Sequence, residues 1–383
     1  MSLESNISKY YIYFVFRFSL FVAPIFTLFY FDLGYTLLET VFISSTVFYL
    51  TWVVFEIPTG IFADKFGRKK SMVIGSTFLV VGGLLIIWAP SFEALVVASF
   101  LTGLWGAFDS GASSALLYDS LKALKRENEF KKIQGNALFF AQVSLGLTAL
   151  VGAYVYTLNI RYPFVLAFFG FCIALVASVL FEEPPIKKKN TSFVAHFLDS
   201  LSFVWKTPAV RWIVVYNSLI ISFYFIFFRN LIQPYIQSVG VDILLFGIFF
   251  ALFRFSAAVG SKFSVRFEKM LGGWRMLFLL PILFALSYLL MGIFPSVYGL
   301  LSLFLLFFVA GAYLPLVSGY INRHSPSDKR ATILSIDSMA VYVFSAVLVI
   351  AWVLISDMVG LPTAIFISGI TLLGITVLLF WKK

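Results

Sequence analysis

The chain has 383 residues, of which 61% are hydrophobic and only 12% are charged, and its mean hydropathy is +0.98. Apolar content this high over the whole length excludes a soluble globular domain and indicates a polytopic membrane protein. The net charge of +10 fits this class because basic residues gather on the cytoplasmic loops of membrane proteins. No nucleic-acid partner is therefore expected.

Apolar runs long enough to cross a bilayer as a helix recur along the whole chain. They predict an all-α polytopic membrane protein with about twelve transmembrane helices. The spans are expected at residues 9–32, 37–62, 71–90, 93–121, 131–158, 160–181, 209–238, 242–264, 274–294, 296–321, 329–356 and 360–381.

The connections between the spans alternate in charge. Basic residues gather in every second connection, at 65–70, 122–132, 187–211, 262–275, 323–330 and 382–383. The other connections hold Arg161 as their one basic residue, together with acids such as Asp32 and Asp357. By the positive-inside rule, the basic connections and both termini lie in the cytoplasm, and the protein is expected in the cell's plasma membrane.

The connection FEEPPIKKKNTSFVAHFLDSLSFVWKTPAVRW divides the chain nearly in half. We expect residues 1–182 and 209–383 to form two six-helix halves. Residues 183–208 are predicted to be a cytoplasmic linker with an amphipathic helix on the membrane surface. Gly60 precedes a basic turn after the second span, and Gly260 takes the same place after the eighth. Such echoes indicate a duplicated six-span unit.

The stretch GIFADKFGRKK places five charges in one turn of this apolar chain. Its pattern of Gly60, Asp64, Lys65, Gly67, Arg68 and Lys69 matches the signature loop between the second and third helices of the major facilitator superfamily. The resemblance covers essentially the whole chain. FEIPTGIFADKFGRKK, SSALLYDSLK, QPYIQSVG and RATILSI are also similar to a prokaryotic branch grouped with drug exporters. The resemblance implies two pseudo-symmetric halves that rock about a central site, which they expose to each side in turn.

A cytoplasmic turn that holds two moving halves together needs strong but breakable contacts, such as charge pairs. By resemblance, Asp64 faces the start of span 11, where Ser325 is expected as the N-cap and Pro326 as the first helical residue. Arg68 is expected to pair with Asp119, while the alternative is that these charges only set the topology. The predicted gating residues are Gly60, Asp64, Lys65, Gly67, Arg68, Lys69 and Asp119.

Ionisable side chains inside the hydrocarbon are costly, so each is a functional hypothesis. Arg17 and Asp109 are expected to pair, because spans 1 and 4 line the cavity in this fold and opposite charges reduce each other's desolvation cost. The pair is predicted to couple transport to protons, and the alternative is a static salt bridge. Glu56 and Asp337 are the next candidates for proton coupling, or else form hydrogen bonds between helices.

Several residues of the second half are candidates for contact with a substrate. Arg229 and Arg254 are expected either to be structural or to attract an anionic group. Gln233 and Tyr235 flank Pro234 in span 7 and offer polar contacts within an aromatic stretch. These residues suit a bulky amphipathic solute.

The pattern as a whole predicts a proton-coupled secondary transporter that exports small organic compounds as a monomer, without cofactor or metal. A uniporter, a symporter or a lipid flippase remains open on the same fold. A membrane-bound enzyme or sensor is disfavoured because no catalytic cluster and no long connection is present. Two departures from many drug exporters count against antiport but not against the fold: Ser99 stands where they carry arginine, and span 5 has no proline.

Overall fold

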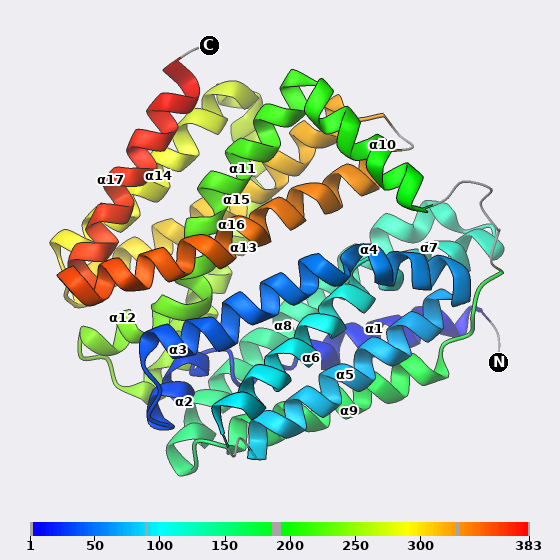
Figure 1. The fold of residues 1–383 in the computed structure, drawn as a ribbon, viewed down its shortest axis with the longest axis horizontal. Coiled ribbons are helices and arrows are strands. Elements are labelled where there is room, and N and C mark those ends of the chain that lie inside the picture. Colours follow the sequence, from blue (N-terminus) through cyan, green and yellow to red (C-terminus); the bar gives the residue numbers. More distant parts are fainter. Residues whose placement is uncertain (1–2, 89–90, 186–192, 327–328, 382–383) are drawn as a thin grey trace. The chain divides into compact units, whose positions relative to one another are not determined.

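The computed structural model describes residues 3–88, 91–185, 193–326 and 329–381, and every regular element within these ranges is helical (Figure 1). Contacts divide the chain into two compact units. The first unit comprises Met1–Phe29 with Val47–Val194, and the second comprises Tyr30–Thr46 with Ala195–Lys383. The all-α class predicted from the sequence is confirmed.

Helices of the first unit pack in pairs along their length. These helices are α1 (Ser5–Arg17), α4 (Phe48–Phe66), α5 (Arg68–Trp88), α6 (Phe92–Ser110), α7 (Ala112–Ala123), α8 (Phe130–Leu158) and α9 (Tyr162–Leu180). Helix α6 packs against α4 and α5, and α1 packs against α8 and α9. A short helix, α2 (Phe26–Asp32), carries the chain from the first unit into the second.

The second unit is assembled in the same way, with α13 against α15, α14 against α17 and α11 against α16. Its helices are α3 (Leu37–Val41), α10 (Phe193–Lys206), α11 (Pro208–Ile226), α12 (Ile232–Ser238), α13 (Phe246–Leu271), α14 (Gly273–Ile293), α15 (Leu300–His324), α16 (Arg330–Val359) and α17 (Leu361–Trp381). Within the described ranges, two segments are π-helical, Phe42–Val47 and Phe227–Leu231. Short 3-10 turns at Glu127–Glu129, Ile243–Leu245 and Val297–Gly299 lead into α8, α13 and α15.

Among the described residues, eleven helical segments are long and apolar enough to cross a membrane. The predicted first span is different, because α1 ends at Arg17 and α2 begins at Phe26. Pro24 lies in the irregular stretch between them. Proline lacks the backbone N–H that a helix needs and its ring disfavours helical geometry in the residue before it, which accounts for an interruption here.

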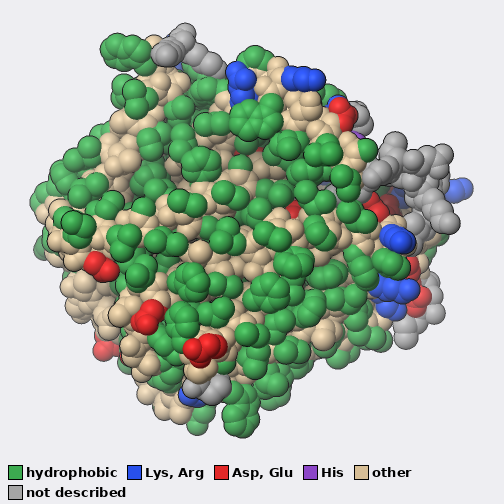
Figure 2. Space-filling view, viewed as in Figure 1, with side chains coloured by type: hydrophobic (Ala, Val, Ile, Leu, Met, Phe, Trp, Pro, Cys, Tyr) green, Lys and Arg blue, Asp and Glu red, His purple; other side chains and the backbone are tan. Residues whose placement is uncertain are grey.

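Large hydrophobic side chains are exposed on both units. Phe139 and Leu147 of α8 are 63% and 61% exposed, and Leu301 of α15 is 67% exposed. Figure 2 shows hydrophobic side chains over most of the visible face and few charged ones. A surface of this kind is stable against lipid rather than water, as expected of a multi-pass membrane protein.

Equivalent helix pairs in the two units make the same contact. In the first unit the Thr59 hydroxyl of α4 donates a hydrogen bond of 2.9 Å to the Ala107 carbonyl of α6, 48 residues on. In the second unit the Ser256 hydroxyl of α13 donates one of 2.8 Å to the Phe304 carbonyl of α15, again 48 residues on. The predicted duplication is thus visible in the packing.

Helix α10 lies within the predicted linker and is tied to the start of α16. The Lys329 ammonium pairs with the Asp199 carboxylate at 2.6 Å. This hydrogen bond and the charge of Lys329 hold the pKa of Asp199 below its usual value. The basic residues predicted at 187–189 and 382–383 lie outside the described residues.

Candidate functional site

A buried ion pair in the first unit joins two residues that the sequence places in one site. Arg17 is the last residue of α1, and its guanidinium pairs with the Asp109 carboxylate on α6. The two side chains are only 11% and 6% exposed. The Tyr13 hydroxyl donates a hydrogen bond of 2.6 Å to the other carboxylate oxygen of Asp109. One carboxylate therefore receives both a cation and a phenol.

Aromatic rings surround the Arg17 guanidinium. The ring centres of Phe14, Phe18 and Trp105 lie 4.2, 4.8 and 5.9 Å from its Cζ atom. A ring face attracts a cation, most strongly where water is excluded. These rings and Asp109 together offset the loss of hydration of Arg17.

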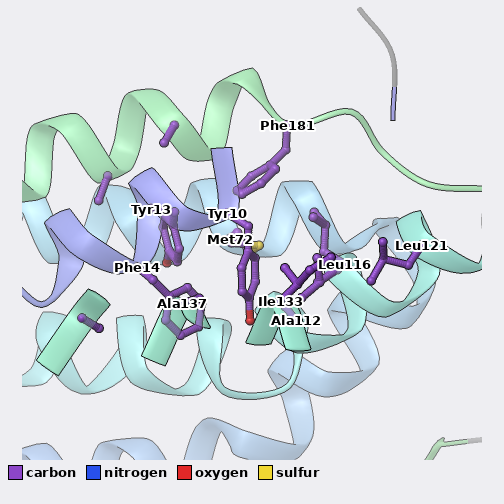
Figure 3. Packing of buried hydrophobic residues seen from close by; sticks show 14 of the residues in the cluster. Tyr10, Tyr13, Phe14, Met72, Ala112, Leu116, Leu121, Ile133, Ala137 and Phe181 are labelled. Atoms are coloured by element: carbon purple, nitrogen blue, oxygen red, sulfur yellow. The ribbon is translucent and has the colours of Figure 1, made fainter. Parts of the chain in front are cut away.

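Packing of α1 fixes the position of this site (Figure 3). Tyr10 and Tyr13 are fully buried in a cluster with Met72 of α5 and side chains of α7, α8 and α9. The Tyr13 ring lies 6.1 Å from that of Phe181. Sequence reasoning missed Tyr13, although it precedes Arg17 by four residues and thus shares its helix face.

The second acid of the first unit, Glu56, forms hydrogen bonds with neutral partners. The Trp52 indole N–H donates to it at 2.9 Å from one turn earlier in α4. The Ser110 hydroxyl at the end of α6 donates at 2.9 Å. Among the residues that the structure describes, no cation pairs with Glu56. Its carboxylate links α4 to α6.

In the second unit, Asp337 of α16 faces Asn217 of α11. The Asn217 amide donates a hydrogen bond of 2.8 Å to one carboxylate oxygen of Asp337. The second carboxylate oxygen and the Asn217 carbonyl oxygen are buried without a hydrogen-bond partner in the described part of the chain. The structure thus places Asp337 in a polar pair within the span, and its role in proton coupling stays a prediction.

Arg229 lies in the π-helical segment that follows α11, and it binds the polypeptide backbone. Its Nε donates a hydrogen bond of 2.8 Å to the Ser44 carbonyl, in the other π-helical segment of the same unit. The adjacent Asn230 accepts hydrogen bonds of 2.9 Å from the hydroxyls of Ser44 and Ser45. This cluster joins Phe42–Val47 to Phe227–Leu231.

Gln233 and Tyr235 are buried in α12. The Tyr235 hydroxyl donates to the Met291 carbonyl of α14 at 3.3 Å. Substrate contact by these two residues stays a prediction. Arg254 of α13 is half-buried and lies over aromatic rings of its own unit, an arrangement that the sequence did not reveal.

The signature loop joins α4 to α5 through Gly67, whose φ is +113°. Side chains other than glycine rarely adopt this conformation. The Arg68 guanidinium pairs with the Asp64 carboxylate at 2.5 Å, within the loop itself. Asp119 lies on α7, and its pairing with Arg68 stays a prediction. The Lys65 ammonium lies 5.3 Å from the centre of the Phe66 ring.

A carboxylate that the sequence did not single out caps α5. Glu183 accepts hydrogen bonds from the backbone N–H groups of Arg68 and Lys69, at 2.7 and 2.9 Å. A carboxylate is stabilising at this position because the helix N-terminus carries unpaired N–H groups and a partial positive charge. A Cβ on Gly67 would lie 2.6 Å from the Glu183 carboxylate. Glycine is therefore required at this position both by its positive φ and by the close approach of Glu183. The feature of the sequence that could have indicated this cap is the pair of acids Glu182 and Glu183 in the stretch FEEPP.

Span 11 begins close to its predicted start, since the span was expected at 329–356 and α16 begins at Arg330, but the expected roles of Ser325 as N-cap and Pro326 as first helical residue are wrong. Ser325 is the C-cap of α15, its hydroxyl is buried without a hydrogen-bond partner in the described part of the chain, and α16 begins at Arg330. Pro326 therefore follows a helix rather than opening one, which is a common place for proline after a C-cap. Whether Asp64 faces this region stays a prediction.

Comparisons with known proteins identify a family and relatives that the chain resembles. The sequence profile of the Major Facilitator Superfamily matches residues 10–347. The chain is 24% identical over 330 residues to the uncharacterized MFS-type transporter YxaM of Bacillus subtilis (strain 168), and the match covers 82% of this chain and 80% of that relative.

Two solved structures share the fold. The crystal structure of the nucleoside transporter NupG matches with a TM-score of 0.79 at 14% identity, over 100% of this chain and 100% of that chain. The crystal structure of a D-xylose-proton symporter matches with a TM-score of 0.78 at 11% identity, over 98% of this chain and 96% of that chain. At such identities the likeness extends to the fold alone.

Proposed function

Because the chain belongs to the major facilitator superfamily of membrane transporters, we propose that it is a proton-coupled secondary transporter that works by alternating access. It acts as a monomer in the plasma membrane and exports small organic, amphipathic compounds. The family and the relatives are transporters and not enzymes. The D-xylose-proton symporter of the same fold supports proton coupling on this scaffold.

The observation that carries this proposal is the buried site of Arg17, Asp109 and Tyr13. With Asp109 ionised, the site is neutral and the ion pair ties α1 to α6. When the carboxylate takes up a proton, the site becomes a cation and this tie weakens. Proton binding thereby changes the contact between two spans that are expected to line the cavity, which is what coupling requires.

Transport into proteoliposomes with an imposed pH gradient, screened over candidate solutes, tests the proposal. Asp109→Asn keeps the size of the side chain and one of its two acceptor oxygens but cannot exchange a proton. We expect this variant to lose gradient-driven transport and to retain counterflow of solute. Thr102→Ala is the matched control on α6, because its hydroxyl bonds the Ser99 carbonyl of its own helix. It should transport at the wild-type rate.

An unchanged pH dependence in Asp109→Asn would remove this site from the mechanism and leave Glu56 and Asp337 as the next acids to test. The same assay separates the other modes of transport on this fold. If the wild-type protein moves solute at a rate that does not depend on the pH gradient, it is a uniporter. Accumulation with the inward proton flow identifies a symporter, and movement of labelled lipid between leaflets identifies a flippase.

A further inference from the structure

We propose that Arg254 binds the anionic group of the transported solute and that four aromatic side chains beside it form the apolar part of the same site. The four are Tyr224, Phe228, Phe250 and Phe307, and together with Arg254 they are called the aromatic site. This inference rests on the transport function proposed above and names the class of solute: a small organic carboxylate with an aromatic or apolar body.

Arg254 lies deep in its span. The segment Ile243–Leu271 is long and apolar enough to cross the membrane. At 1.5 Å per residue, Arg254 lies roughly 16 Å from the Ile243 end and further from the Leu271 end. The hydrocarbon core is about 30 Å thick. A guanidinium near the middle of such a span needs a partner of opposite charge or a polar cavity.

The other two arginines within the hydrocarbon obtain compensation from the protein itself. Arg17 has the carboxylate of Asp109, and Arg229 has the carbonyl of Ser44. Among the described residues no carboxylate pairs with Arg254, and its Nε, like that of Arg17, is buried without a hydrogen-bond partner. The Tyr224 side chain interacts with the guanidinium but is neutral. A positive charge therefore remains without a counter-ion.

Aromatic rings pack against the guanidinium of Arg254 and against one another. The ring centres of Phe228 and Phe250 lie 5.1 and 6.0 Å from the Cζ atom of Arg254. The Tyr224 ring is nearly parallel to that of Phe228 at 5.8 Å. Phe307 meets both of these rings edge-on, at 5.7 and 5.8 Å. Phe250 and Phe307 are buried, whereas Phe228 and Arg254 are half-buried. Part of the Arg254 and Phe228 side chains is therefore left exposed.

Three helices and a π-helical segment of one unit build the aromatic site. Tyr224 comes from α11, Phe250 from α13, Phe307 from α15 and Phe228 from the π-helical segment. A π-helical turn inside a helix often marks a functional site. By the internal duplication, α11 and α15 correspond to spans 1 and 4, which are expected to line the cavity.

The chemistry of the site selects an organic anion. A guanidinium offers parallel N–H donors that match a carboxylate, and such charge-assisted bonds strengthen in a medium of low dielectric constant. Phe228, which is half-buried and packs on the other three rings, provides stacking surface for an aromatic or apolar body. A cationic solute is repelled, and a neutral one leaves the charge of Arg254 uncompensated.

Equilibrium binding to the purified full-length protein in lipid nanodiscs tests this inference. Isothermal titration calorimetry compares each anion with its neutral amide: benzoate with benzamide, 2-naphthoate with 2-naphthamide, and 4-phenylbutyrate with 4-phenylbutyramide. We expect at least one anion to bind roughly ten- to hundredfold more tightly than its amide, the range that a charge-assisted contact supplies.

Three variants assign that preference to the site. Arg254→Gln should abolish the preference for the anion, and Arg254→Lys should keep part of it. Phe228→Leu should weaken binding of the anion and of the amide together, and it tests the site even if the arginine variants fail to fold. Arg266→Gln removes the same charge from an exposed position of α13 and should bind as the wild type.

The inference is overturned if no pair shows a preference for the anion, or if Arg254→Gln or Phe228→Leu binds as the wild type. Binding at equilibrium needs no proton gradient. Loss of gradient-driven transport with anion binding intact would therefore contradict the proposed coupling and leave the aromatic site standing.

Discussion

An arginine inside the hydrocarbon must be compensated, and Arg17 is compensated more fully than the others. It has the Asp109 carboxylate, and the faces of Phe14 and Phe18 lie within 5 Å of its Cζ atom. A buried ion pair of this kind adds little net stability, because desolvation consumes most of the attraction. Removing one partner, however, leaves an uncompensated charge in the interior.

Arg17→Ala should therefore lower the free energy of unfolding by about 3–5 kcal/mol near neutral pH. The double variant Arg17→Ala/Asp109→Ala should recover much of the loss. Thermal melting of the purified single and double variants measures these effects. A double variant that is no more stable than Arg17→Ala would contradict this account.

The pairing of Arg17 with Asp109 is predicted from the sequence and observed, because the family resemblance places spans 1 and 4 at one cavity and opposite charges there reduce each other's desolvation cost. The sequence does not predict Tyr13 or Glu183. Tyrosines and acids of similar context occur at many positions, and the contacts of these two depend on how helices far apart in the sequence pack. The same holds for the rings around Arg254, which come from three helices and a π-helical segment.

At the scale of helices, apolar runs predict the spans well because the bilayer fixes their length. The predicted spans 71–90 and 274–294 correspond to the observed segments Arg68–Trp88 and Gly273–Ile293. The prediction of helix boundaries fails at two prolines. Pro24 lies in the interruption of the first span, and Pro326 follows α15 instead of starting α16. A proline marks a boundary without showing which helix it bounds.

Close packing of α13 against α15 gives a prediction at this scale. A Cβ on Gly311 would overlap the Ala257 carbonyl of α13, whereas a Cβ on Gly319, two turns later in α15, meets open space. Gly311→Ala should destabilise the protein by about 1–3 kcal/mol through overpacking. Gly319→Ala should be neutral or stabilise by up to about 1 kcal/mol, since alanine favours the helix.

Thermal melting followed by size-exclusion chromatography of the two glycine variants compares them directly. Both substitutions add one methyl group to the same helix, so a difference between them reports the contact and not helix propensity. Similar melting temperatures for the two variants would show that α13 and α15 have room to separate.

At the scale of the whole molecule, the signature loop must keep its geometry while the protein changes conformation. Gly67 sets the turn, Glu183 caps α5 through two backbone N–H groups, and the Asp64–Arg68 pair spans the junction. All of these contacts lie within the first unit. Asp64 and Arg68 remain partly open to further contacts, because their side chains are 39% and 25% exposed.

We therefore expect Asp64→Asn and Arg68→Ala to leave the protein folded and to slow its conformational cycle. A charge-assisted contact that these residues make in only one state of the cycle contributes about 1.5–3 kcal/mol, less where water screens it, so losing it shifts the equilibrium between the two states by about tenfold. Both variants should melt close to the wild type, because Glu183 continues to hold the loop, while transport in proteoliposomes slows by about that factor. Glu127→Ala, an exposed acid in the next basic connection, is the control and should transport normally. If both loop variants express well and transport at the wild-type rate, these charges serve topology alone.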